Sequence, residues 1–193
     1  MLGLGTRYVC EDVMIIGFNG LPRSGKDTCC DILVADYGYE KLSFSQPLMV
    51  MIDTINPKIS GTGFLRDATA ALGYEKAKDL IPEYRRLLQN VAQSCREVID
   101  EDVWLDLLYR QIQPHKSYCI SNVRYRNEYW RTRNYPHDLG GIVVHVTSPN
   151  EVPASDHISD HDLEGLDFDA EICNDGTIDD LRVKVHDIVE RFT

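Results

Sequence analysis

Short apolar runs of strand length alternate along this chain with segments whose apolar residues recur at helical spacing. The runs predict five strands, near Val13–Phe18, Tyr39–Phe44, Tyr118–Ile120, Gly141–Val146 and Ala170–Cys173. Strands that alternate with helices form parallel sheets that are covered on both faces. The pattern therefore predicts an α/β fold with a parallel five-stranded sheet flanked by helices on both faces.

The remaining segments are expected to be helices and two polar loops. Helices are predicted over Gly25–Asp36, Gln46–Ile55, Phe64–Leu72, Leu80–Ile99, Trp104–Leu108 and Asn127–Asn134, with a last one capped by Thr177 and Asp180. Pro, Gly and Ser make Asn56–Gly63 a loop. Pro149–Leu166 is a polar, acidic, lid-like loop.

Length and composition indicate a single domain that does not bind nucleic acid. At 193 residues we expect one domain over residues 13–193, preceded by a tail at 1–12. The net charge of −11 argues against a nucleic-acid surface, and no apolar run approaches membrane-spanning length. The six cysteines lack metal spacing, so we expect reduced core residues of a cytosolic protein.

The segment Gly17–Thr28 reads GFNGLPRSGKDT and contains a candidate phosphate-binding loop. Gly20, Gly25 and Lys26 fit the pattern G-x-x-x-x-G-K, with a predicted strand before it and a helix after it. Glycines let the backbone wrap around a phosphate, the helix N-terminus faces the anion, and lysine adds a mobile charge. The sequence therefore predicts a nucleotide phosphate site, with Arg23, Ser24 and Thr28 as further loop contacts.

Asp27 stands where this motif usually has Ser or Thr, whose hydroxyl binds Mg²⁺. A carboxylate is a hard ligand, so Asp27 is a candidate Mg²⁺ ligand. Alternatively, it only favours the positive end of the helix.

Three classes of phosphate-loop protein compete at this point. A switch GTPase needs N-K-x-D after a strand, which is absent, and a motor domain usually needs a longer chain and an acidic strand end. A small phosphotransferase needs arginines for a second anion site, and Arg66, Arg85, Arg86, Arg124 and Arg126 are available. The residues therefore favour a phosphotransferase.

Several ordered motifs together resemble the deoxynucleoside monophosphate kinases of bacteriophages. They are the loop at Gly20–Thr28, KLSFSQPL from Lys41, RRLLQN from Arg85, DVW at Asp102–Trp104, NVRYRNE from Asn122, HISD from His157 and NDGT from Asn174. The resemblance covers the chain from about Met14 onward. It implies ATP- and Mg²⁺-dependent transfer of a phosphoryl group to a deoxynucleoside monophosphate, in the cytoplasm, or the host cytoplasm if the chain is phage-encoded. The protein could also form a homodimer.

The residues themselves, together with the resemblance, indicate roles for particular positions. Lys26, Arg124 and Arg126 are the candidate catalytic residues, and Asn174 and Gly176 are expected beside adenine. The candidate acceptor-binding residues are Phe44, Arg66, Arg85, Arg86, Gln89, Trp104, Arg124 and Glu128. Arg131 and Arg133 are expected to be solvated.

Several of these residues could instead have a purely structural role. Arg85 and Arg86 could be solvated charges, Phe44 and Trp104 could be core residues, and Glu128 could only start a helix. His157 and His161 are interpreted as loop residues rather than metal ligands.

Two positions depart from the family pattern. Asn122 replaces an aspartate after the third strand, and Arg126 stands where proline is more usual. A kinase of another small phosphorylated metabolite, resembling phosphomevalonate kinase, is the alternative function.

Overall fold

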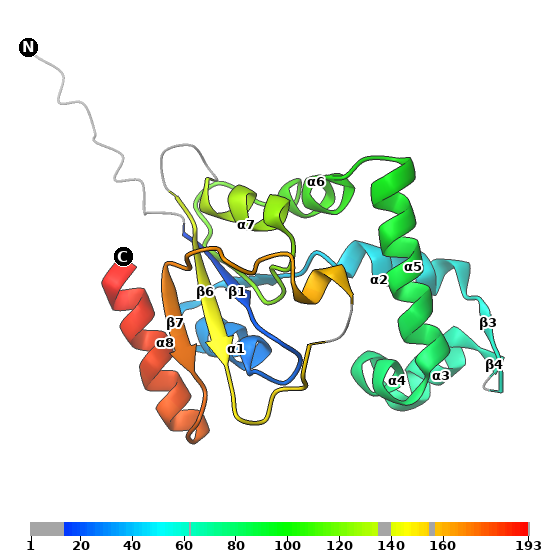
Figure 1. The fold of residues 1–193 in the computed structure, drawn as a ribbon, viewed down its shortest axis with the longest axis horizontal. Coiled ribbons are helices and arrows are strands. Elements are labelled where there is room, and N and C mark those ends of the chain that lie inside the picture. The colour runs from blue at the N-terminus through cyan, green and yellow to red at the C-terminus, as the bar shows by residue number, and fades with distance from the viewer. Residues whose placement is uncertain (1–13, 62, 135–139, 155–156, 193) are drawn as a thin grey trace, which may run out of the picture. The chain divides into compact units, whose positions relative to one another are not determined.

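The computed structural model describes residues 14–61, 63–134, 140–154 and 157–192, so the predicted tail at 1–12, Val13 and Cys10 lie outside the described residues. The chain divides into two compact units (Figure 1). The sheet unit contains residues 1–42 and 112–193, and the helical unit contains residues 43–111. The single domain expected over residues 13–193 stays a prediction.

The sheet unit is built on five parallel strands in the order β2-β5-β1-β6-β7. They are β1 (Ile15–Asn19), β2 (Glu40–Leu42), β5 (Tyr118–Ile120), β6 (Ile142–Thr147) and β7 (Ala170–Cys173). Nearly all residues of the three central strands, β5, β1 and β6, are buried, as expected for a sheet covered on both faces. The predicted parallel five-stranded sheet is confirmed.

Helices cover both faces of this sheet, as the sequence predicts. Helices α1 (Lys26–Tyr37) and α8 (Ile178–Phe192) pack on one face, where Leu33 and Val185 belong to the same buried core as the strands. Helix α7 (Arg126–Arg133) packs on β1 and β6. Figure 1 shows α8 running alongside β7. Helix α1 ends at Gly38, whose φ of 72° and N–H bonds to helix carbonyls make a left-handed cap.

The helical unit has its own apolar core. Its elements are α2 (Gln46–Ile55), β3 (Lys58–Ile59), β4 (Gly63–Phe64), α3 (Leu65–Leu72), α4 (Tyr74–Leu80), α5 (Pro82–Val98) and α6 (Val103–Tyr109). Prolines at the first turns of α2 and α5 suit those positions, because the missing N–H would have no helical partner there. Tyr84 and Leu88 of α5 are buried among residues of the other helices.

Some predicted boundaries differ from the structure. Strand β2 ends at Leu42, and Phe44 lies in the turn before α2. The loop predicted at Asn56–Gly63 contains β3 and the first residue of β4, an antiparallel pair that extends to Phe64. The helix predicted from Leu80 begins at Pro82, because α4 ends at Leu80 and proline starts a new helix.

The described cysteines are free, but not all are core residues. Cys29, Cys30 and Cys119 are buried, whereas Cys95 is half-buried and Cys173 is exposed. The core expectation is therefore wrong for Cys173, whose side chain points away from the core in the edge strand β7.

Of the helices that the structure describes, none is both long and apolar enough to span a bilayer.

A polar pair joins β1 to β6 at their carboxyl ends. Asn19 and His145 are register partners, and Asn19 Oδ1 lies 2.7 Å from His145 Nδ1. Asn19 Nδ2 donates to the Val123 carbonyl oxygen at 2.9 Å, so its Oδ1 is the acceptor and Nδ1 of His145 carries the hydrogen. Burial lowers the pKa of His145 and outweighs the charges of Glu171 and Glu151, which raise it. The ring is therefore neutral at pH 7, with an unprotonated Nε2.

Burial in the sheet-unit core predicts different costs for two valines of α8. Val185 is 1% exposed and Val183 is 60% exposed. Val185→Ala should lower the free energy of unfolding by about 2 kcal/mol, and Val183→Ala by less than about 0.5 kcal/mol. Both changes raise helix propensity equally, so the difference reports packing. Urea unfolding measures it, and equal losses would contradict this packing of α8.

The lowered pKa of His145 predicts a loss of stability in acid. Because the unfolded chain binds the proton at a higher pH than the folded one, stability falls as pH drops below about 6.5. Thermal unfolding between about pH 7.5 and pH 5.5 should show a smaller loss for His145→Gln than for the wild type. The exposed His115→Gln is the control and should keep the wild-type loss. An equal loss in His145→Gln would refute the assignment.

Candidate functional site

The glycine loop between β1 and α1 has a backbone that only glycine accommodates at two positions. Gly20 has φ 151° and Gly25 has φ 102°. A Cβ on Gly20 would lie 2.3 Å from the Val146 carbonyl oxygen, so the loop is packed closely against β6. Arg23 also has a positive φ, 68°, which is uncommon for a residue with a side chain. The loop is thus held in a strained, curved form directly before the N-terminus of α1.

The turn after β7 closes on this loop. Asn174 Nδ2 donates to the Ser24 carbonyl oxygen at 3.0 Å, and a Cβ on Gly25 would lie 2.3 Å from that nitrogen. Asn174 N donates to the Thr147 carbonyl oxygen at 2.7 Å. Gly176 lies in the same turn, before the capping pair of Thr177 and Asp180. The adenine role of Asn174 and Gly176 stays a prediction, and the structure gives Asn174 a role in shaping the loop.

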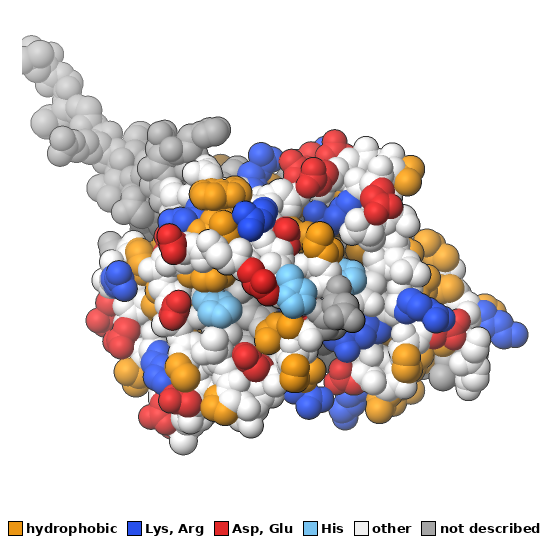
Figure 2. Space-filling view, in the orientation of Figure 1, with side chains coloured by type: hydrophobic (Ala, Val, Ile, Leu, Met, Phe, Trp, Pro, Cys, Tyr) orange, Lys and Arg blue, Asp and Glu red, His pale blue; other side chains and the backbone are white. Residues whose placement is uncertain are grey.

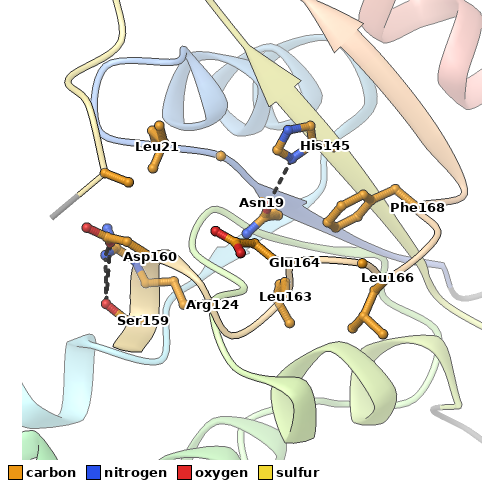
Figure 3. A pocket seen from close by; sticks show the side chains of 13 residues that line it. Asn19, Leu21, Arg124, His145, Ser159, Asp160, Leu163, Glu164, Leu166 and Phe168 are labelled. Atoms are coloured by element: carbon orange, nitrogen blue, oxygen red, sulfur yellow. Dashed lines mark hydrogen bonds and ion pairs between the residues drawn. The ribbon is translucent and has the colours of Figure 1, made fainter. Parts of the chain in front are cut away.

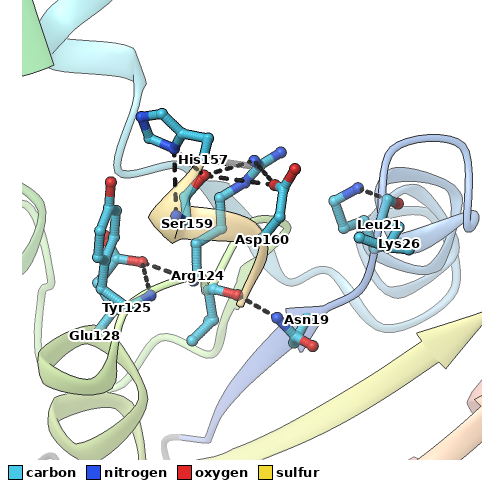
Figure 4. Close-up of polar contacts among 10 residues, drawn as sticks. Asn19, Leu21, Lys26, Arg124, Tyr125, Glu128, His157, Ser159 and Asp160 are labelled. Carbon is cyan, nitrogen blue, oxygen red and sulfur yellow. Dashed lines mark hydrogen bonds and ion pairs between the residues drawn. The ribbon is translucent and has the colours of Figure 1, made fainter. Parts of the chain in front are cut away.

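Two side chains of the loop are buried although they are polar. Ser24 is 0% exposed, and its Oγ has no hydrogen-bond partner among the described residues. Lys26 is 5% exposed, and its Nζ donates to the Leu21 carbonyl oxygen at 3.1 Å (Figure 4). A buried hydroxyl without a partner is costly, so an anion that accepts its hydrogen would be favoured here.

Asp27 and Thr28 follow at the start of α1. The Asp27 carboxylate is 66% exposed, and its Oδ1 lies 3.5 Å from Lys41 Nζ. Lys41 also pairs with Asp31 at 2.9 Å. Thr28 is half-buried. An exposed carboxylate at a helix N-terminus fits both the metal-ligand and the helix-terminus interpretations.

Arg124 reaches the lid-like loop from the segment after β5. Its Nη1 lies 3.3 Å from Asp160 Oδ1 and 3.5 Å from Ser159 Oγ, as Figure 4 shows. Its backbone N donates to Glu128 Oε2 at 2.8 Å, and Tyr125 N donates to the same oxygen at 3.2 Å. The buried Glu128 carboxylate thus accepts backbone N–H groups at the start of helix α7 and caps that helix, which was the alternative for this residue. Its acceptor role stays a prediction.

Two further arginines of α7 contact acidic residues. Arg126 N donates to Asp162 Oδ2 at 2.8 Å, and its Nη2 donates to the Glu164 carbonyl oxygen at 3.3 Å. Arg133 Nη2 lies 2.6 Å from Asp169 Oδ1. The expectation that Arg133 is solvated is wrong, because Asp169 also binds the Val143 N–H and thereby ties α7 to β6.

A cavity of about 290 Å³ lies beside the glycine loop, wholly within the sheet unit (Figure 3). Its apolar walls include Leu21, Leu163 and Phe168, and its polar groups include Arg124 and His145. The Phe168 and His145 rings are stacked with centroids 4.8 Å apart. The cavity therefore adjoins both the phosphate loop and the arginine that faces the lid-like loop.

The expected acceptor residues of the helical unit differ in exposure. Phe44 and Trp104 are each 4% exposed, and Trp104 Nε1 donates to the Ala92 carbonyl oxygen at 3.1 Å. The structure thus gives both a packing role, and base stacking stays a prediction. Arg66 Nη2 donates to the Asp53 carbonyl oxygen at 2.8 Å. Arg85 and Arg86 are exposed on α5 and Gln89 is half-buried, so both interpretations of these arginines stay open.

Sequence reasoning missed the pair of Asn19 and His145, and it missed Asp160 as a partner of Arg124. A signal for His145 was present, because it interrupts the apolar run of β6 near the strand end. Ligands of parallel sheets gather at such ends. Asp160 ends the motif HISD that carries part of the resemblance, but nothing in the sequence indicated Arg124 as its partner.

Charged side chains of both signs are mixed on the surface of the sheet unit. Figure 2 shows acidic, basic and hydrophobic side chains interspersed over the β6–β7 face of the sheet unit, rather than a single cationic patch. Within the described ranges, histidine, cysteine, aspartate and glutamate side chains form no group of three that could hold a metal ion. His161 Nδ1 instead lies 2.6 Å from Glu164 Oε1.

Comparison with known proteins identifies the family. The family model for deoxynucleotide monophosphate kinase matches residues 83–185, more than half of the chain. A protein of Acanthamoeba polyphaga mimivirus, provisionally named a deoxynucleotide monophosphate kinase, is 23% identical over 199 residues, which cover 92% of this chain and 97% of the relative.

Solved kinase structures show a weaker likeness. Dephospho-CoA kinase from Campylobacter jejuni has 12% identity and a TM-score of 0.42, covering 91% of this chain and 95% of its own. The Mycobacterium tuberculosis APS kinase CysC in complex with AMPPNP and APS also has 12% identity and a TM-score of 0.42, covering 93% and 98%. Scores this low do not establish a shared fold, so the assignment depends on the sequence match. On that match, this chain belongs to the deoxynucleotide monophosphate kinase family and is a phosphotransferase.

Proposed function

We propose that this protein transfers the γ-phosphoryl group of ATP to the phosphate of a deoxynucleoside monophosphate. The bond from the γ-phosphorus to its bridging oxygen breaks, an acceptor phosphate oxygen bonds to that phosphorus, and ADP leaves. The family assignment supports the reaction class. The proposal places the reaction in the cytoplasm, of a host cell if the chain is phage-encoded.

The observation that carries the proposal is the buried, partnerless Ser24 Oγ inside the glycine loop. Together with the tightly curved backbone at Gly20 and Gly25 and the N-terminus of α1, it favours an anion at this loop. Lys26 Nζ, now on the Leu21 carbonyl oxygen, would exchange that neutral partner for the outer phosphates. These features suit a nucleoside triphosphate.

The charge that develops during transfer would be met by arginine and a metal ion. Arg124 lines the cavity that Gly20 and Leu21 also line, so we assign it to the transferring phosphoryl group, with Arg126 beside it. Asp27 would hold Mg²⁺, which neutralises phosphate charge when bound. Arg85 or Arg86, with Gln89, Arg66, Phe44 and Trp104, would form the acceptor site of the helical unit.

A panel of acceptors with ATP tests the substrate class. The panel contains dAMP, dGMP, dCMP, dTMP, modified dUMPs and phosphomevalonate. At least one deoxynucleotide should be phosphorylated with kcat/KM at least about a hundredfold above that for phosphomevalonate, because a site built for a base rejects a ligand without one. Lys26→Ala should abolish turnover while circular dichroism stays unchanged. Turnover of phosphomevalonate alone, or full activity of Lys26→Ala, would refute the proposal.

Arginine substitutions test which cation serves the transfer. Arg124→Ala and Arg126→Ala should each lower kcat by about a hundredfold with little change in ATP affinity, since the interaction counts mainly in the transition state. Arg131→Ala, at an exposed position on the same helix as Arg126, is the matched control and should be near neutral. A large loss only in Arg131→Ala would overturn the assignment.

A further inference from the structure

The lid-like loop contains no arginine or lysine, yet it contacts arginines through its acids. Asp160 pairs with Arg124, and Asp162 pairs with Arg126. We propose that Asp160 is a positioning residue, which orients the Arg124 guanidinium for phosphoryl transfer. This inference rests on the proposed function of Arg124. In this proposal the lid-like loop supplies an acidic side chain that orients an arginine of another segment. The loop does not supply the cation itself.

The geometry leaves most of the guanidinium available. Asp160 Oδ1 and Ser159 Oγ both contact Nη1 of Arg124, at 3.3 Å and 3.5 Å. Nε and Nη2 have no protein partner among the described residues, and a guanidinium has five N–H donors in one plane. Asp160 thus holds Nη1 of the guanidinium and leaves Nε and Nη2 to bind phosphoryl oxygens.

Arg124 is anchored at both ends. Its backbone N–H is held by the buried carboxylate of Glu128 at 2.8 Å, while its guanidinium is held by Asp160. A long side chain fixed in this way loses less rotamer freedom when it engages the reacting group. The same anchoring lowers the cost of reaching the transition-state geometry.

The loop itself is braced where Asp160 lies. The single helical turn Ile158–Asp160 begins at His157, whose Nδ1 accepts from Ser159 N at 3.2 Å and lies 2.8 Å from Ser159 Oγ. The Asp160 side chain is 10% exposed, against 32% for Arg124. The carboxylate is therefore the fixed partner, and the arginine is the one being placed.

Two possible roles of Asp160, neutralising Arg124 or orienting it, predict opposite effects of removing the carboxylate. If Asp160 merely neutralised Arg124, its removal would strengthen the attraction for phosphate and raise activity. If it aims Arg124, its removal lets the side chain sample other rotamers and lowers kcat. Because the Asp160 carboxylate is largely buried, the thermal unfolding midpoint of each variant is measured beside its kcat, so that a loss of folded protein is separated from a loss of catalysis.

The experiment compares Asp160→Asn with Asp167→Asn in the full-length protein, using ATP and the best acceptor. Asp167 is exposed just beyond the lid-like loop, so its substitution removes the same charge without touching Arg124. Asp160→Asn should lower kcat by about tenfold with less than about a twofold change in the KM for ATP. Asp167→Asn should stay within about twofold of wild type in both, and Asp160→Glu should recover part of the loss. An unchanged or raised kcat in Asp160→Asn, or an equal loss in Asp167→Asn, would overturn the inference.

The double variant separates this inference from the proposed function. Asp160→Asn combined with Arg124→Ala should be no slower than Arg124→Ala alone, because a positioning residue has no effect without its arginine. If Arg124→Ala lowers kcat and Asp160→Asn does not, only the inference fails. If Arg124→Ala keeps the wild-type kcat, the catalytic assignment of Arg124 fails and the inference fails with it.

Discussion

The contact between Gly25 and Asn174 is the constraint on which the site depends. Asn174 Nδ2 donates to the Ser24 carbonyl oxygen, and the space for a side chain on Gly25 is filled by that amide. Because the strands are parallel, the carboxyl ends of β1 and β7 lie at one edge of the sheet, although their residues are far apart in sequence. The fold thereby fixes the entry to α1 and the anion site that precedes it.

In this acidic protein, individual cations near the glycine loop, and not the net charge, provide the attraction for phosphate. The net charge of −11 would repel a triphosphate, but Lys26 is buried within the loop and Arg124 lines the adjacent cavity. Two acids of the lid-like loop, Asp160 and Asp162, pair with arginines, which limits their repulsion of phosphate. The loop is also tied to the phosphate loop, since Val152 N donates to the Pro22 carbonyl oxygen at 2.8 Å.

The sequence was sufficient to predict features that depend on local pattern. The five strands follow from apolar runs, and the glycine loop follows from residues within a short segment. Helix α4 was not predicted, and the predicted start of the next helix at Leu80 falls on the last residue of α4, because apolar spacing continues across Leu80 and Ile81 and Pro82 alone marked the break. Contacts such as Asp160 with Arg124 and Asn19 with His145 could not be predicted, because they join distant segments through side chains whose directions only the fold determines.

The most direct test of this account is the ATP affinity of Gly25→Ala compared with Gly38→Ala, measured by isothermal titration calorimetry. Both glycines have positive φ and flank α1, so both variants place a side chain on backbone that favours glycine. A Cβ at Gly38 meets nothing within 4 Å, whereas one at Gly25 would lie 2.3 Å from Asn174 Nδ2. The account predicts that Gly25→Ala loses ATP binding while remaining folded by circular dichroism, and that Gly38→Ala keeps it. Equal ATP affinities in the two variants would contradict the claim that this contact shapes a nucleotide site.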